Sequence, residues 1–484
     1  MKAQDKVKAR KTVRSKSKAP APRIATVRNE VRIRAGSRAC KPEAGAEEGE
    51  PITLPEEAHV MTIAPTGAGK GVSGTVPILL QYPGSMIVLD PKGEQAAITA
   101  RRRRELGQAT YVIDPFGVSG LPPASYNPLD FIEAEMADST DDASAIADIL
   151  LPASLDPRNL FWRNRAAYFL TSAILHAATD YPPEERNMLT VRDIVHKMTT
   201  ACHQPPGQPP AEPVFRSRHP EVMRINDLFG LGAPETLGSM LHFAMEGVGF
   251  VRGPLLEQSL ARSSFSLDDL TEGAPMTIYL VLPPHLVATH GSLLRLWLGT
   301  LFGALTRRRS RPEHATLLLL DEAAQLGTFP PLRTALTLLR GYGVQTWSFW
   351  QQPSQLEELY PADWKSLVGN CRVVQCFGAQ SPAAWQQLAD VLGVDINAFG
   401  KLDDNAMLML RNGEVQIVDR LDYRTDRAMQ GMFDPNPIHE QVRGVLRRPS
   451  ARLRPDGAAP GCTDGGEQAD ATFRGVCLDI GKLW

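Results

Sequence analysis

The chain has 484 residues, 43% of them hydrophobic and 22% charged, which allows two or three domains with a sizeable core. Its six cysteines are scattered without a Cys-x-x-Cys pair, which argues against a zinc ribbon or a disulfide framework and fits a reducing cytosol. No apolar run reaches the length of about 18 residues that a membrane-spanning helix needs, so we expect no integral membrane segment.

The near-neutral net charge of −2 hides an uneven distribution. The first 41 residues hold 14 Lys or Arg against 2 acidic residues, so the other 443 residues carry 14 more acids than bases. Residues 1–50 show no apolar periodicity and are predicted to be a disordered basic arm. Such an arm is typical of segments that bind nucleic acid or anionic lipid, and a solvated tail fits the pattern equally well.

Strand and helix signals alternate through residues 51–132. Short apolar runs predict strands at 59–64, 85–90 and 109–113, and the segments between them predict helices at 71–81 and 96–106. This alternation indicates parallel β-α-β units.

The α/β pattern then stops and later resumes. Residues 133–274 have a helical character, with apolar residues at helical spacing over 159–178, and predict an inserted all-α domain. Residues 441–484 are rich in Gly, Pro and Asp and predict a flexible tail. Within 275–440 we expect a helix at 292–306 and strands at 275–282, 315–320, 344–350 and 372–377.

The strongest chemical signal is residues 64–71, Ala-Pro-Thr-Gly-Ala-Gly-Lys-Gly, between a predicted strand and a predicted helix. Glycines let the backbone bend so that several N–H groups point at one phosphate, and the helix N-terminus adds its positive dipole end. Lys70 would bring a cation to the β- and γ-phosphates of ATP. The predicted nucleotide-binding residues are Thr66, Gly67, Ala68, Gly69, Lys70 and Gly71.

This loop departs from the usual pattern at two positions. Ala64 stands at the first glycine, which is a mild change, and Gly71 replaces the Ser or Thr whose hydroxyl holds Mg²⁺. The metal is then short of one ligand. Ser73, Thr75 or a water molecule could supply it, and Ser73 is the candidate ligand.

A second half-site follows the apolar run 316–320, where Asp321 and Glu322 come directly after four leucines. Asp321 would orient Mg²⁺ or its water shell, and Glu322 would polarise the attacking water. An Asp-Glu pair is often merely solvated, but its position after a buried strand, with a phosphate loop on the same chain, favours the catalytic interpretation.

Two further strand ends carry polar residues. Gln351 follows the predicted strand 344–350, where an amide can contact the γ-phosphate and report hydrolysis, although an ordinary polar strand end fits equally. Residues 90–94, Asp-Pro-Lys-Gly-Glu, also end a strand on the presumed nucleotide edge, because ligands bind at the carboxyl ends of parallel strands. A plain turn is the alternative there.

Several motifs together resemble a known family. The segments APTGAGKG, IVLDPKGE, VIDPFG, YNPLDFI, LLLLDEAAQLG, RGYGVQ and QQPSQLEELY occur in this order in TraG/TraD-type coupling proteins of bacterial conjugation and type IV secretion. The resemblance covers residues 55–440. It implies an α/β fold class: a RecA-like P-loop NTPase domain with a mostly parallel sheet, formed by residues 51–132 and 275–440, with the all-α insertion and disordered termini.

The resemblance also implies how the motor works. ATP and Mg²⁺ would bind between neighbouring subunits of a homo-hexamer, and an arginine of one subunit would reach the γ-phosphate of the next. Arg340 is the candidate arginine finger, although an ordinary solvated arginine fits nearly as well. The predicted catalytic residues are thus Lys70, Glu322, Gln351 and Arg340, with Asp321 and Ser73 on the metal.

The family function implied is the delivery of DNA, as a relaxase–DNA complex, or of a protein substrate to a type IV secretion channel at the inner membrane. Family members commonly begin with transmembrane helices, whereas this sequence begins with the basic arm. We therefore expect a protein of the bacterial cytoplasm, at most peripheral at the inner face of the cytoplasmic membrane. Two alternatives stay open: a substrate-docking receptor with weak ATPase activity, and a soluble HerA/FtsK-like DNA-processing ATPase.

Overall fold

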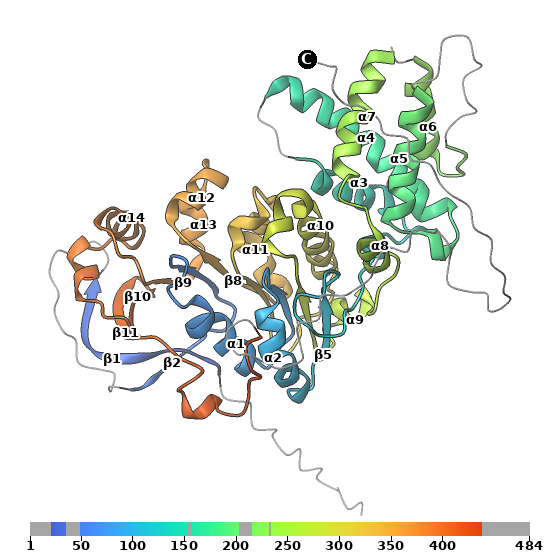
Figure 1. Ribbon diagram of the computed structural model, residues 1–484. Helices are drawn as coiled ribbons and strands as arrows, with labels where there is room; N and C mark the ends of the chain where they lie inside the picture. Colours follow the sequence, from blue (N-terminus) through green and yellow to red (C-terminus); the bar gives the residue numbers. More distant parts are fainter. Residues whose placement is uncertain (1–20, 35–48, 153–155, 203–214, 232–233, 438–484) are drawn as a thin grey trace, which may run out of the picture. The chain divides into compact units, whose positions relative to one another are not determined.

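The computed structural model describes residues 21–34, 49–152, 156–202, 215–231 and 234–437. Eleven strands of the described residues form one sheet (Figure 1). The predicted tail at 441–484 lies outside the described residues. The strand order is β2-β1-β11-β10-β9-β3-β8-β7-β4-β6-β5.

The strands from β9 to β5 run parallel to one another. Most of their residues are buried, because helices cover both faces of a parallel sheet. The sequences of such strands are therefore nearly continuous apolar runs. All of them lie where the apolar runs predicted strands. Their bounds are β3 (His59–Ile63), β4 (Met86–Leu89), β5 (Ala109–Ile113), β6 (Met276–Leu280), β7 (Thr316–Leu320), β8 (Val344–Trp350) and β9 (Cys371–Cys376).

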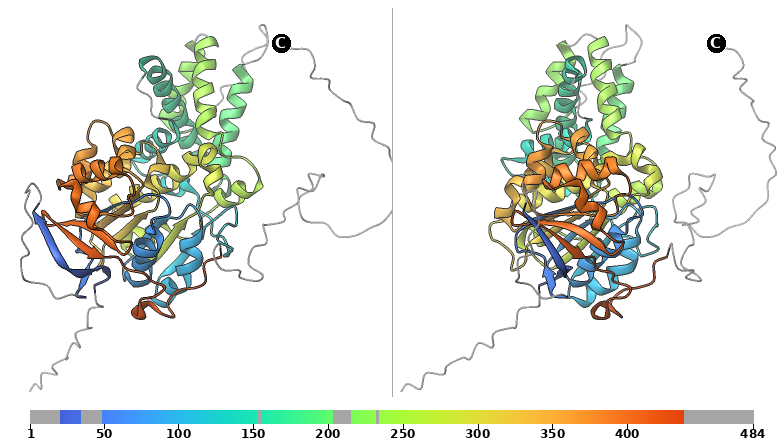
Figure 2. Two further views of the ribbon diagram at one scale, coloured as in Figure 1. Left: turned by 60° about the vertical axis from the view of Figure 1, so that its left-hand side comes forward. Right: turned by 90° about the vertical axis from the view of Figure 1, so that its left-hand side faces the viewer.

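An antiparallel extension continues the sheet beyond β9. It consists of β10 (Ala406–Arg411), β11 (Glu414–Asp419), β1 (Arg23–Arg34) and β2 (Pro51–Thr53). Strand β1, in blue, and β11, in orange, lie side by side in both views of Figure 2. The prediction of disorder throughout residues 1–50 is thus wrong for β1.

The physical reason for this error is that the partners of β1 are remote in the sequence. Arg23 forms an ion pair of 2.7 Å with Asp426, and Arg28 pairs with Asp403 and with Asp419. Ile24 is buried in the core. The basic composition that predicts disorder is therefore compensated by acids from the other end of the chain.

Helices cover both faces of the sheet, and alternate side chains of β7 pack against the helices of opposite faces. Leu317 and Leu319 join an apolar cluster with residues of α1 and α2, whereas Leu318 and Leu320 join a larger cluster with residues of α10 and α11. The bounds are α1 (Val76–Gln81), α2 (Glu94–Glu105), α10 (Val287–Thr306), α11 (Pro330–Leu338), α12 (Pro353–Leu359), α13 (Trp364–Gly369) and α14 (Pro382–Leu392).

The helix predicted at 71–81 is present but begins differently. Its first turn, Gly71–Thr75, has π-helical hydrogen bonding, in which Val76 donates its N–H to the Gly71 carbonyl, and α1 follows. Pro77 lacks the N–H that would bond to residue 73 in a regular α-helix, which favours the wider first turn.

The segment between β5 and β6 contains helices and no strand among its described residues, and Figure 2 shows the longer helices gathered as a bundle. Buried apolar side chains of α3 and α4 belong to the same cluster as those of β7 and α10, so packing marks no sharp boundary. The division into domains at 133 and 274 stays a prediction. The helices are α3 (Ser139–Leu150), α4 (Pro157–Asp180), α5 (Met188–Cys202), α6 (Pro220–Leu231), α7 (Pro234–Val248), α8 (Pro254–Leu260) and α9 (Leu267–Glu272).

Short 3-10 helices punctuate the connections. No helix of the described residues combines the length and the apolar character that a membrane crossing requires. The 3-10 helices are η2 (Pro128–Phe131), η3 (Pro183–Glu185), η4 (Pro284–Leu286), η5 (Ala323–Leu326), η6 (Leu339–Tyr342), η7 (Ile396–Lys401) and η8 (Arg427–Met429).

Candidate functional site

Three neighbouring strands end at the candidate site. Strand β8 lies between β3, which leads into the glycine-rich loop, and β7, which leads into the acidic pair. The carboxyl ends of parallel strands meet at one edge of a sheet, and this edge is where ligands of such folds bind. The structure therefore brings Lys70, Glu322 and Gln351 together, although they are far apart in the sequence.

Direct contacts join these three side chains. Lys70 Nζ lies 3.2 Å from Glu322 Oε1 and donates a hydrogen bond of 3.0 Å to the Ala64 carbonyl oxygen. Gln351 Nε2 donates a hydrogen bond of 2.8 Å to Glu322 Oε2. The Lys70 side chain is only 8% exposed. A cation, a carboxylate and an amide are thus held at one point of the sheet edge.

The backbone of Glu322 is in the left-handed region, with φ 55° and ψ 53°. A residue with a side chain adopts this conformation at a cost of about 1–3 kcal/mol, and such strain gathers at functional sites. The sharp turn directly after β7 aims the carboxylate at Lys70 and Gln351 rather than along the strand.

Glycines shape the loop before Lys70. Gly67 and Gly69 have φ of 80° and 88°, which residues with side chains rarely adopt. A Cβ on Gly69 would also lie 2.6 Å from Arg420 Nη2, and a Cβ on Gly378 would lie 2.4 Å from Ala68 Cβ. The loop is therefore confined by the end of β9 and by the Arg420 side chain.

Arg420, which follows β11, is a site residue that the sequence reasoning missed. Its Nη2 donates 2.7 Å to the Ala68 carbonyl and 2.8 Å to Ser73 Oγ, and its Nε donates 3.0 Å to the same hydroxyl. The guanidinium also stacks 4.2 Å over the ring of Phe377. No local sequence motif identifies Arg420 as a site residue, because β11 and the glycine-rich loop are far apart in the sequence and come together only in the folded sheet.

These contacts decide how Ser73 can act. Its hydroxyl donates 3.1 Å to the Gly69 carbonyl and accepts both bonds from Arg420. One donor and two acceptor positions are the full capacity of a hydroxyl group. The arrangement does not fit the predicted role of Ser73 as a metal ligand, because the cationic guanidinium already occupies its acceptor positions.

Asp321 sits among charged neighbours. Its Oδ2 accepts a hydrogen bond of 2.8 Å from Gln95 Nε2 on α2, a partner that the sequence reasoning missed. Burial, reinforced by the nearby Glu322 carboxylate, raises the pKa of Asp321 to about 6, against the opposing effects of Lys70 and Lys92. A bound cation would therefore stabilise the ionised form of the Asp321 carboxylate.

Asp90, at the end of β4, is a buried acid of this edge. Its Oδ2 accepts a hydrogen bond of 2.8 Å from the Ala96 N–H at the start of α2. Burial raises its pKa to about 8, and the negative charges of Asp321 and Glu94 act in the same direction. Residues 90–94 thus follow a strand that pairs in parallel with β7 and end at the same sheet edge as the acidic pair, as predicted, whereas any contact with nucleotide stays a prediction.

Arg340 lies away from this group of residues. It is exposed on η6, which precedes β8, and its charge adds to burial in lowering the pKa of His59, the first residue of β3, to about 4. It therefore belongs to the amino end of the strands, whereas Gln351 follows the carboxyl end of β8. The structure does not bring Arg340 to the site of its own chain.

Of two large cavities among the described residues, only the first is lined by residues of the site. One, of about 880 Å³, is lined by the glycine-rich loop, Gln351, Trp385, Asp404 and Arg420. It is bounded by both the loop and the antiparallel extension of the sheet, and its volume suits a nucleotide-sized ligand.

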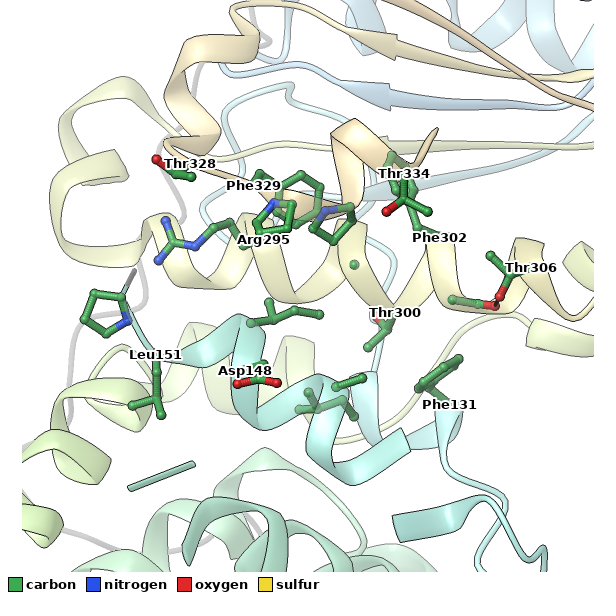
Figure 3. Close-up of a pocket in the computed structure, with 18 of the residues that line it drawn as sticks. Phe131, Asp148, Leu151, Arg295, Thr300, Phe302, Thr306, Thr328, Phe329 and Thr334 are labelled. Carbon is green, nitrogen blue, oxygen red and sulfur yellow. Dashed lines mark hydrogen bonds between the residues drawn. The ribbon is translucent and has the colours of Figure 1, made fainter. Parts of the chain in front are cut away.

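The other cavity, of about 790 Å³, lies between α3 of the helical segment and α10 with the start of α11 (Figure 3). Its lining is mostly apolar, and Arg295 reaches across one end. Arg295 Nη1 donates 3.4 Å to the carbonyl of Leu326, four residues beyond Glu322. The cavity thus adjoins the segment that follows the acidic pair.

The comparisons with known proteins agree with this geometry. The family model described as Type IV secretory system conjugative DNA transfer matches residues 1–395. The chain belongs to this family of conjugative DNA-transfer proteins.

Among curated relatives, the conjugal transfer protein TraG of Agrobacterium fabrum is 27% identical over 306 residues, covering 62% of this chain and 45% of the relative. The protein VirD4 of Rhizobium radiobacter is 29% identical over 309 residues, covering 61% of this chain and 42% of the relative. The chain spans about half the length of the curated relatives it matches.

Among solved structures, the bacterial conjugative coupling protein TrwBdeltaN70 superposes with a TM-score of 0.60 at 16% identity, over 80% of this chain and 90% of the other. The plasmid coupling protein TrwB in complex with ADP and Mg²⁺ superposes with a TM-score of 0.59 at 15% identity, over 79% of this chain and 90% of the other. These likenesses establish the predicted RecA-like P-loop fold.

Proposed function

We propose that this chain is an ATP-hydrolysing coupling protein that delivers DNA, as a relaxase–DNA complex, or a protein substrate to a type IV secretion channel. The observation that carries the proposal is the contact of Lys70, Glu322 and Gln351 at one sheet edge. They lie beside a glycine-rich loop whose glycines have the positive φ angles that a phosphate-binding turn requires. Membership of the conjugative DNA-transfer family supports the transport role. Structures of the plasmid coupling protein TrwB in complex with a non-hydrolysable ATP analogue and with ADP and Mg²⁺ support nucleotide binding.

The residues divide the chemistry between them. The N–H groups of the loop and the Lys70 ammonium bind the phosphates of ATP and hold their negative charge. Glu322 polarises the attacking water, and the Gln351 amide, which follows β8, contacts the γ-phosphate and reports hydrolysis. Asp321 would hold a divalent cation, and Mg²⁺ there would supply Lewis-acid stabilisation of the negative charge on the phosphate oxygens. Each role uses a side chain already directed to this edge.

Arg340 acts on a neighbouring subunit in this proposal. It is exposed at the amino end of β8 and cannot serve the site at the carboxyl end of the same strand. Leu338 and Tyr342 on either side of it are 65% and 39% exposed, an apolar character that suits a protein interface. These features support a homo-oligomeric ring, a hexamer by family resemblance, in which Arg340 stabilises charge at the next nucleotide.

The proposed partners follow from the family and the charge pattern. The cargo is DNA with its relaxase or a secreted protein, and the receiving partner is the secretion channel at the inner membrane. We place the protein in the bacterial cytoplasm, with peripheral attachment to the inner face of the membrane through the basic arm or through a channel subunit.

ATPase assays with and without DNA test the proposal. We expect DNA to stimulate phosphate release, and Lys70→Ala or Glu322→Gln to abolish it. If the DNA is bound mainly through its phosphates, DNA affinity should fall steeply with salt. Stimulation that persists undiminished in both variants would exclude the proposed active site.

One observation favours a second function, a substrate-docking receptor with weak hydrolysis. Gly71 stands where the metal-binding hydroxyl is expected. Turnover at saturating Mg²⁺ and ATP separates the two functions, because a receptor should bind ATP and barely hydrolyse it. A soluble HerA/FtsK-like ATPase would instead hydrolyse ATP with DNA but show no affinity for a secretion channel.

A further inference from the structure

Two parts of the 880 Å³ cavity beside the glycine-rich loop differ in their chemistry. One part of its lining is the loop itself with the Arg420 guanidinium, and backbone N–H groups and a guanidinium suit an anion. Another part belongs to α14, from which Ala384, Trp385 and Leu388 line the cavity. A nucleotide has the same division, because anionic phosphates and an aromatic base are joined through one ribose.

Trp385 is the aromatic side chain that a ligand in this cavity can reach. The other aromatic residue of the described lining, Phe399, is 3% exposed and belongs to the core. Trp385 is half-buried, so that only part of it packs against that core. Its Nε1 donates a hydrogen bond of 2.7 Å to the Ala379 carbonyl, which uses the only polar atom of the indole. The ring therefore offers π surface rather than a donor to the cavity.

The indole is tied to the glycine-rich loop through a short stretch of chain. Gly378 has a φ of 74° and lies against the loop, since a Cβ built on it would be 2.4 Å from Ala68 Cβ. The next residue, Ala379, accepts the bond from Trp385. Since neighbouring Cα atoms are 3.8 Å apart, the indole lies on the order of 10 Å from Ala68. A ligand whose phosphates lie on the loop can therefore place its base at this ring.

We propose that Trp385 stacks on the base of the nucleotide whose phosphates are bound by the glycine-rich loop. The inference rests on the proposed function and assigns a residue to the part of ATP that Lys70, Asp321 and Glu322 do not bind. Stacking on an aromatic side chain uses the π face of a nucleobase. Because the indole N–H is already bonded to Ala379, Trp385 adds affinity without a hydrogen bond to the edge of the base.

The test compares a ligand that carries a base with one that lacks it. Trp385→Ala should weaken the binding of ATP about 5–100-fold, the range expected when a stacking side chain is removed. Its affinity for inorganic tripolyphosphate, which has the phosphates without ribose or base, should equal that of the wild type. Isothermal titration calorimetry at one fixed Mg²⁺ concentration measures both affinities.

Two further variants separate stacking from support of the fold. Trp385→Phe keeps an aromatic face and removes the indole N–H, so its ATP affinity should lie much closer to that of the wild type than to that of Trp385→Ala. Trp364→Ala is the matched control, because Trp364 on α13 is a half-buried indole that packs against the same core outside the described cavity lining. It should leave both affinities unchanged.

Fluorescence gives a measurement that does not depend on the alanine variant. Stacking of a base on an indole quenches its emission, so ATP should quench the tryptophan fluorescence of the wild type, and tripolyphosphate should not. In Trp385→Phe the quenching by ATP should be lost while ATP still binds. Quenching that persists in Trp385→Phe would overturn the inference.

Three calorimetric results would also overturn it. They are an unchanged ATP affinity in Trp385→Ala, an equal loss of ATP and tripolyphosphate affinity in that variant, or a loss in Trp385→Phe as large as in Trp385→Ala. The second would show that the indole only supports the loop, and the third would assign the effect to the bond with Ala379. A wild-type protein that binds neither ATP nor tripolyphosphate would instead contradict the proposed function itself.

Discussion

Gln351 Nε2 lies 2.8 Å from Glu322 Oε2, so the ends of the neighbouring strands β8 and β7 are joined by a side-chain hydrogen bond. The same carboxylate lies 3.2 Å from Lys70 Nζ through its other oxygen. Glu322 is therefore the shared partner of the loop lysine and the strand-end amide. A single carboxylate links the lysine proposed to bind phosphate with the amide proposed to report hydrolysis.

Glu322→Gln should separate nucleotide binding from hydrolysis. The amide keeps the size of the side chain but cannot polarise water, so we expect ATP to bind while phosphate release falls about 10²–10⁴-fold. Lys70→Ala should instead weaken ATP binding itself. Glu358→Gln, on the exposed face of α12, is the matched control and should leave both quantities unchanged. Equal ATPase activity in Glu322→Gln and wild type would contradict the assignment.

Arg420→Ala should weaken the binding of ADP and of ATP to a similar extent. Arg420 contacts Ala68 and Ser73 and no atom of Glu322 or Gln351 among the described contacts, so we place it at the end of the phosphates away from the γ-phosphate. The loss of a charge-assisted hydrogen bond predicts an affinity about 10–100-fold lower, measured by calorimetry.

The control is Arg424→Ala. Arg424 lines the same cavity but is exposed and paired with Asp422 at 2.7 Å, so its removal should change nucleotide affinity little. A loss restricted to ATP in Arg420→Ala would instead place its guanidinium at the γ-phosphate.

Mixed subunits test Arg340. Arg340→Ala and Lys70→Ala chains should each be inactive alone, and mixing them should restore part of the ATPase activity if the arginine acts on a neighbouring subunit. Leu338→Asp should reduce assembly, followed by mass measurement, because it places a charge in the exposed apolar surface around Arg340. No recovery in the mixture, with rings assembled normally, would speak against action between subunits.

Asp90 makes stability depend on pH. Burial raises its pKa to about 8, from an ordinary value of about 4. Between these values the folded state binds a proton that the unfolded state has lost, so the free energy of unfolding should fall as pH rises from about 4 to 8. Asp90→Asn removes this titration and should flatten the profile in urea unfolding. The variant should gain stability relative to wild type toward pH 8, and parallel profiles would contradict this.

Removal of residues 1–50 should destabilise the protein more than removal of residues 1–20. The longer deletion takes away β1 with the buried Ile24 and leaves β11 with an open edge. We expect a loss of about 2–5 kcal/mol and a tendency to aggregate, whereas the shorter deletion should leave the free energy of unfolding unchanged. Chemical denaturation and light scattering measure both, and equal stability of the two deletions would contradict the role of β1.

The parallel strands could be predicted from the sequence because each is a short apolar run that is buried on both faces, such as residues 316–320 before Asp321. Strand β1 escaped prediction because its stability comes from β11 and from distant acids, which no local pattern records. The same holds for Arg420 and Gln95. Their contacts with the loop and with Asp321 depend on which strands and helices become neighbours in the fold.

The position of Ser73 shows another limit of sequence reasoning. Its spacing from Lys70 made it a reasonable metal ligand, but its hydroxyl is saturated by the guanidinium of Arg420, which follows β11, a strand absent from the prediction. Local motifs therefore located the loop, whereas the hydrogen bonds of its individual side chains depend on which residues become neighbours in the fold.

Strand β8 has a mechanical consequence for an assembled ring. All seven of its residues are buried, and it is held on both sides by β3 and β7, so it cannot easily bend or stretch. Gln351 follows one end and η6 with Arg340 precedes the other. In the proposed ring, a displacement of Arg340 at a neighbour's nucleotide would pass along this rigid strand to Gln351, which would couple hydrolysis in one subunit to the nucleotide state of the next.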